Sequence, residues 1–255
     1  MTPNHSSLSP TEGGLREQLA AYFLAAPPPA EQTPAQRQEY LKKLNQLGEI
    51  ERQEILTGAG CSRPMVWGNP VELLQALLTA AQRLGAGLGQ PLLLFPAKET
   101  DIRLDTLLHP RLLSVAVVSL LRDGVTAAPR RPLWVRLAEQ SHCLAVSVTA
   151  EQPFGSPQTT AILKECTKLH SGSLVHCKNT VLFSCGEVLE PPPGVRLYTA
   201  PTAEELLRDT LSPVWTGFYA GVYSSLASSK GSTNSVSGNE NASVSDSSSS
   251  GADTD

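Results

Sequence analysis

Hydrophobic positions near the start of the chain recur twice at the spacing of a helix. The first segment, 15–26, ends at three prolines, which cannot continue a helix. The second segment, 34–56, has Thr33 as a candidate cap and Pro34 in its first turn. The pattern therefore predicts a helical hairpin. A hairpin this short cannot bury its apolar stripes alone, so we expect it to pack on the rest of the protein or on a second copy of itself.

A third helical pattern covers 69–84, with Asn69 as its cap. Gly85, Gly87 and Gly89 come after this helix and before an apolar segment that is typical of a strand. In a nucleotide-binding loop, glycines instead follow a strand and open a helix. We therefore expect these glycines to end the helix, with glycine at the left-handed cap position.

The rest of the chain alternates between the two-residue spacing of strands and the spacing of helices. Strands are predicted at 91–95, 101–105, 132–139, 143–150, 173–178 and 180–188, and helices at 112–128 and 159–170. This order predicts an α/β (α+β) sandwich, with a mixed sheet that carries helices on one face.

The pattern divides the chain into five parts. We expect a disordered N-terminal arm at 1–14, the hairpin at 15–58, an α/β domain at 69–188, an extension at 189–223 that packs on this domain, and a disordered tail at 224–255. The tail is rich in serine and has almost nothing to bury, so it cannot offset the entropy of ordering.

Composition excludes several classes of function. The net charge is -4 and the 20 basic residues are scattered, so no nucleic-acid surface is indicated. The longest apolar run, within 112–121, is too short to cross a bilayer, and the first residues do not resemble a signal peptide. The five cysteines are odd in number and include no Cys-x-x-Cys pair, which argues against a secreted disulfide framework. We therefore expect a cytoplasmic protein with reduced thiols.

Candidate metal and catalytic residues form no strong motif. Cys166 and His170 are four residues apart on a predicted helix and could share one face. His176 and Cys177 are neighbours on a predicted strand and point to opposite faces, so they cannot both complete such a site. No Gly-x-Ser-x-Gly nucleophile motif is present. Nothing in these residues, taken alone, requires an enzyme.

The segment "HPRLLSVAVVSLLRDGVTAA" is an apolar helix pattern with a polar break near its end. This segment, with the order of elements over 69–188, resembles the catalytic ATP-binding (GHKL ATPase) domain of sensor histidine kinases. In that family the helix carries an asparagine that holds the Mg²⁺ bridging the ATP phosphates. The resemblance implies that Asp123 stands at the metal-binding position and Ser119 at the preceding asparagine of the motif.

The next motif of the family is poorly matched. A strand there leads into Asp-x-Gly-x-Gly, whose Asp accepts a hydrogen bond from adenine, whereas "LAVSVTAEQPFG" has Ala150 at that position and Gly155 one place late. A methyl group cannot accept this bond, and Glu151 is the candidate substitute. The resemblance thus implies Ser119, Asp123, Glu151 and Gly155 as cofactor-binding residues. The glycines of the family's lid are missing, whereas "LHSGSL" keeps one glycine of its closing motif, Gly172.

The hairpin resembles the dimerisation helices of these kinases, yet 15–56 contains no histidine that could accept a phosphoryl group. We therefore expect a degenerate kinase that has lost ATP and Mg²⁺ and acts as a regulatory or scaffold partner in a two-component system. Its partner would be a response regulator or another signalling protein, with a homodimer formed through the hairpin. The alternative is a weak ATP-binding histidine kinase or ATPase, with Asp123 on Mg²⁺ and Glu151 on adenine. A third interpretation is an α/β interaction domain whose ancestry says nothing of its present role.

Overall fold

The computed structural model of the chain describes residues 10–26, 31–58, 64–87, 90–95, 105–140, 143–185 and 190–208. The helices are α1 (Pro10–Ala25), α2 (Pro34–Leu56), α3 (Pro70–Gly87), α4 (Pro110–Ala127), α5 (Pro157–Leu169) and α6 (Ala203–Arg208). The strands are β1 (Val66–Gly68), β2 (Leu92–Phe95), β3 (Thr106–Leu108), β4 (Leu133–Gln140), β5 (Cys143–Thr149), β6 (Leu174–Cys177) and β7 (Thr180–Cys185).

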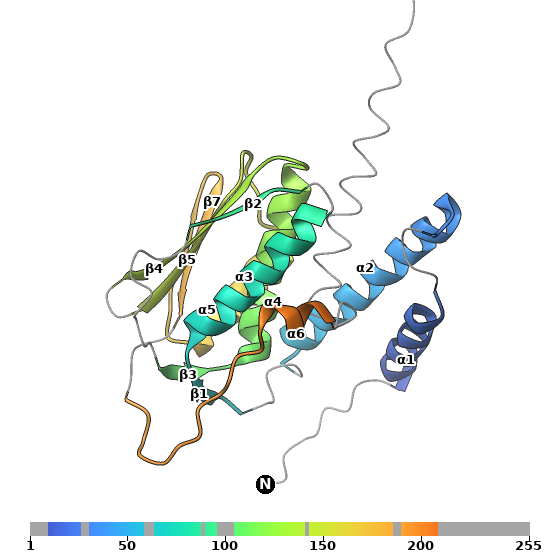
Figure 1. The fold of residues 1–255 in the computed structure, drawn as a ribbon. Coiled ribbons are helices and arrows are strands. Elements are labelled where there is room, and N and C mark those ends of the chain that lie inside the picture. The colour runs from blue at the N-terminus through green and yellow to red at the C-terminus, as the bar shows by residue number, and fades with distance from the viewer. Residues whose placement is uncertain are drawn as a thin grey trace, which may run out of the picture.

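Five of the strands form one mixed sheet in the order β2-β4-β5-β7-β6. Strand β2 is parallel to β4, and the other neighbours are antiparallel. Helices α3, α4 and α5 cover one face of this sheet (Figure 1). The predicted fold class, a mixed sheet with helices on one face, is confirmed.

Helix α4 is the centre of the core. Its side chains from Leu112 to Leu121 are all buried, because the helix is packed between the sheet and the neighbouring helices α3 and α5. The inward-facing residues of the central strands, including Val135, Val146 and Phe183, are no more than 1% exposed. The long apolar run of the sequence is therefore the internal helix of the domain, and the end of this helix reaches the candidate site.

The hairpin pairs α1 with α2, as the apolar spacing predicts. Thr33 caps α2 in a capping box with Gln36. Leu19, Leu44 and Leu47 form a small core of their own. Helix α2 also contacts α5, so the hairpin packs on the α/β domain within one chain. Helix α1 begins at Pro10, inside the segment expected as an arm.

The strand expected at 101–105 lies outside the described residues up to residue 104. The next strand along the chain is β3, which pairs with β1 outside the main sheet. Helix α3 ends at Gly87, one of the three glycines expected to end it, and Gly85 lies within its last turn. Position 85 requires glycine because a Cβ there would lie 2.6 Å from the carbonyl oxygen of Gln90, which is too close for a side chain.

The described part of the C-terminal extension lies against α3 and β1. The backbone N–H of Tyr198 donates to the carbonyl oxygen of Trp67 at 2.6 Å. Helix α6 contacts α3, and Ala203, Leu206 and Leu207 pack against the main core. The aromatic residues beyond α6, from Trp215 on, lie outside the described residues.

Candidate functional site

A cavity of about 450 Å³ opens at the C-terminal end of α4. One wall is the last two turns of that helix, with Asp123, Thr126 and Ala127, and the other is the connection 153–156 between β5 and α5. Both walls belong to elements that pack into the interior of the domain, since Val125 on α4 and Thr159 on α5 are buried. Asp123 is the only ionisable residue among the lining residues that the structure describes.

The Asp123 carboxylate binds the start of α5. Its Oδ2 accepts a hydrogen bond of 2.6 Å from the backbone N–H of Ser156, the N-cap residue of that helix. The Ser156 hydroxyl in turn accepts from the backbone N–H of Thr159 at 3.1 Å. A carboxylate is stabilising at a helix N-terminus, where unpaired N–H groups carry partial positive charge. Asp123 therefore joins the end of α4 to the beginning of α5.

The structure brings only two of the four implied cofactor-binding residues to this cavity. Asp123 and Gly155 line it, and Gly155 has a φ of 105°, which favours glycine. Ser119 is buried within α4 and is not part of the lining. Glu151 is turned to the surface, where its Oε2 lies 3.2 Å from Nε of Arg131.

Ala150, at the position of the adenine-binding aspartate in the resemblance, is fully buried. Its backbone N–H donates to the carbonyl oxygen of Asn179, and its own carbonyl oxygen accepts from Nδ2 of Asn179 at 2.8 Å. Both peptide groups are thus used to fix the end of β5 against the β6–β7 turn. The methyl side chain offers no acceptor to a ligand.

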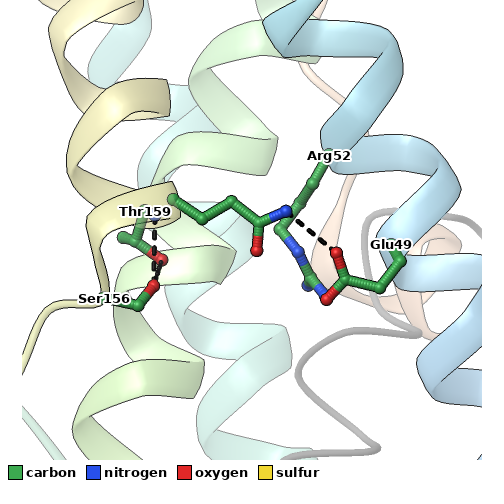
Figure 2. A network of polar contacts seen from close by, with 5 residues as sticks. Glu49, Arg52, Ser156 and Thr159 are labelled. Carbon is green, nitrogen blue, oxygen red and sulfur yellow. Dashed lines mark hydrogen bonds and ion pairs between the residues drawn. The ribbon is translucent and has the colours of Figure 1, made fainter.

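A polar interface between α2 and α5, which the sequence analysis missed, lies beside the site. Figure 2 shows Glu49 and Arg52 of α2 on the side of the helix that faces the start of α5. Nε2 of Gln158 donates to Oε2 of Glu49 at 2.9 Å, and Arg52 donates to the same carboxylate. The Arg52 side chain is only 3% exposed, and its buried Nε has no hydrogen-bond partner among the described residues.

Two positive side chains act on the Glu49 carboxylate: Arg52, which donates a hydrogen bond to it, and Arg122, which acts through its charge. Burial lowers the pKa of Arg122, and the positive charge of Arg52 lowers it further, against attraction from Asp123 and Glu49. Burial acts to raise the pKa of Glu49, but hydrogen bonds from Arg52 and Gln158 outweigh it and leave this pKa below its usual value. The negative charge of Glu49 therefore offsets the positive charges of Arg52 and Arg122 at the interface between α2 and α5.

The other ends of α4 and α5 are joined by histidines. The backbone N–H of His109 donates to Nε2 of His170 at 2.9 Å, so Nε2 is the acceptor of the ring. Nδ1 of His170 lies 2.7 Å from the carbonyl oxygen of Cys166, to which it must donate. Both ring nitrogens are engaged, and among the described residues no group of three or more His, Cys, Asp or Glu could hold a metal ion.

No family model matches this chain, and no curated protein matches it. No helix among the described residues combines the length and apolar character that a membrane span needs.

Solved structures of histidine kinases are similar in fold. The catalytic domain of histidine kinase ThkA is 12% identical, with a TM-score of 0.41, over 49% of this chain and 97% of that chain. The Acinetobacter baumannii histidine kinase AdeS is 9% identical, with a TM-score of 0.45, over 68% and 93%. ThkA in complex with the response regulator TrrA is 12% identical, with a TM-score of 0.45, over 69% and 58%.

Proposed function

We propose that this chain is a histidine-kinase-like signalling protein that acts by binding and does not turn over ATP. The observation that carries the proposal is the hydrogen bond from the Ser156 N–H to Asp123. In the resemblance, Asp123 stands where the family holds Mg²⁺, and here its carboxylate holds α5 to α4. A metal ion would have to share this carboxylate with the Ser156 N–H, which already occupies Oδ2.

The lining of the cavity fits Mg-ATP poorly in two further respects. The lining that the structure describes includes no lysine or arginine, and its single charge is negative. A triphosphate beside that carboxylate would be repelled unless a metal ion lay between them. The Ala150 side chain supplies no acceptor for an adenine amino group, and Glu151 is paired with Arg131.

The partner expected from the resemblance is a response regulator or another signalling protein, and the hairpin is the expected surface for a homodimer. Binding of a purified receiver domain, measured by calorimetry, tests the first part. The mass of the full chain by light scattering during size-exclusion chromatography tests the second, since a dimer would have about twice the 27.2 kDa of one chain.

The competing function is a weak ATP-binding kinase or ATPase, and the presence of an open cavity of about 450 Å³ at the end of α4 favours it. Calorimetric titration with ATP and Mg²⁺, beside an Asp123→Ala variant, separates the two. We expect no heat of binding up to millimolar ATP. Micromolar binding that the variant abolishes would overturn our proposal and establish a working nucleotide site.

A further inference from the structure

The charged side chain at the wall of the cavity beside Ser156 is negative. The cavity lining carries one carboxylate and no basic side chain among the described residues. The nearby Glu151 is neutralised by Arg131, at 3.2 Å, and neither residue is part of the lining. Asp123 therefore sets the sign of the charge at the cavity wall.

The carboxylate retains capacity to accept hydrogen bonds. An ionised Asp offers about four lone-pair positions on its two oxygens. The N–H of Ser156 uses one of these, on Oδ2. The same bond fixes the orientation of the side chain, so a ligand would meet a carboxylate that is already positioned.

Arg122 lies outside the lining of the cavity. It is attracted by Asp123 more strongly than by Glu49, so it offsets part of the negative charge of Asp123 from behind the wall. Asp123 remains the only charged side chain among the described lining residues.

The remaining lining selects the kind of cation. Phe154, Pro153 and Ala127 supply apolar surface, and Thr126 supplies a hydroxyl group. A small hydrated ion gains nothing from apolar walls. A guanidinium group is planar, weakly hydrated, able to stack on an aromatic ring and able to bind a carboxylate through two parallel N–H groups.

We propose that this cavity binds a guanidinium group on an apolar stem, through Asp123 and Phe154. The inference deepens the proposed function, on which it rests, by giving the chemistry of the ligand at the same site. The guanidinium can come from an arginine side chain of a partner protein or from a free small molecule.

The test is an NMR titration of the full ¹⁵N-labelled chain with N-acetyl-arginine-N′-methylamide. We expect saturable shifts of the amides of Thr126, Ala127 and Gly155. The neutral citrulline analogue has nearly the same shape without the charge, and it should bind about tenfold more weakly. Equal affinity for the two compounds, or no saturable shift with the arginine compound, would overturn the inference without any variant.

The matched variant is Asp123→Asn. Asparagine keeps an oxygen that can accept from the Ser156 N–H, but it removes the charge, so we expect about tenfold weaker binding of the arginine compound. Glu151→Gln is the control, since it removes a negative charge that does not line the cavity, and it should change the affinity less than about twofold. Unchanged affinity in Asp123→Asn would refute the assignment.

Two further arms identify the source of the ligand. Tighter binding of a blocked Ala-Arg-Ala peptide than of butylguanidinium supports a partner protein, and equal binding supports a small guanidinium compound. Titration of the same sample with Mg-ATP distinguishes a failure of the proposed function from a failure of the guanidinium inference alone. Micromolar Mg-ATP binding contradicts the proposed function, whereas absence of both ATP and guanidinium binding contradicts only the present inference.

Discussion

Removal of the charge of Glu49 should destabilise the contact between the hairpin and the α/β domain. In Glu49→Gln, the amide oxygen can replace only one of the two carboxylate oxygens. Arg52 donates to Oε1 and Gln158 to Oε2, so the amide nitrogen would face one of these donors. The negative charge beside the buried Arg52 and the partly buried Arg122 is also lost. The two guanidinium groups would then repel one another without the carboxylate that offsets them.

The magnitude follows from the burial of the two partners. Removing one member of a fully buried ion pair costs about 3–5 kcal/mol. Arg52 is 3% exposed, but Glu49 is 49% exposed, so water screens part of the interaction. We therefore expect a loss of about 1–2 kcal/mol in the free energy of unfolding. The matched control on the same helix is Glu39→Gln, whose partner Lys43 lies 3.4 Å away at the surface and which should cost less than about 0.5 kcal/mol.

Urea unfolding of the three proteins at pH 7, followed by circular dichroism, measures these differences. The pH dependence gives a second reading, because the pKa of Glu49 is lowered in the folded protein. A carboxyl group with a lowered folded pKa stabilises the protein above its unfolded pKa, and this contribution is lost as the pH falls through the folded value. The cost of Glu49→Gln should thus shrink in acid. If Glu49→Gln and Glu39→Gln lower the free energy of unfolding by the same amount at pH 7, the charge of Glu49 does not stabilise the buried Arg52. The inference that Glu49 offsets the positive charges at this interface would then be wrong.

The remaining predictions concern the core and its titratable groups. Gly172→Ala should lower the free energy of unfolding, measured in urea, by at least about 2 kcal/mol, because its Cβ would lie 1.9 Å from a backbone carbonyl oxygen of β7. The control is Gly14→Ala, which should be neutral or stabilising because no atom lies within 4 Å of its Cβ. Burial lowers the pKa of His170, so stability should fall as the pH drops below about 6.5, the unfolded value, and His170→Gln should flatten this slope in thermal unfolding at pH 5 to 7. Burial raises the pKa of the Cys185 thiol to about 12, so native protein treated with iodoacetamide should be labelled at the exposed Cys177 and spared at Cys185, as mass spectrometry can show.

Local signals in the sequence predicted most of the elements. Thr33 followed by Pro34 marks the beginning of α2, and Asn69 accepts from the N–H of Val71 at the beginning of α3. Alternation over 132–188 predicted β4, β5 and the β6–β7 hairpin. These elements are long enough for hydrophobic spacing to be regular, and their turns use residues that sit next to them in the chain.

Features that depend on distant partners could not be predicted in the same way. Strands β1 and β3 have only three residues each, and their pairing joins Val66 to Leu108. The sequence does not distinguish a glycine that is required because a Cβ would not fit, such as Gly85, from one that is required for a positive φ. The pairing of Glu151 with Arg131 and of Glu49 with Gln158 is equally invisible, because each joins segments that only the fold brings together.

The role of Asp123 follows from the length of one connection. Strand β5 ends at Thr149 and α5 begins at Pro157, so the chain between them is too short to form a lid and instead brings the N-terminus of α5 directly to the end of α4. A side chain at position 123 then meets a backbone N–H, which needs an acceptor, and the positive end of a helix dipole, which favours a negative charge. Asparagine supplies the acceptor alone, whereas aspartate supplies both. The short connection and the carboxylate therefore stabilise the same junction between α4 and α5. The charge of Asp123 also lies at the cavity wall, so a ligand of this site has to be compatible with a negative charge there.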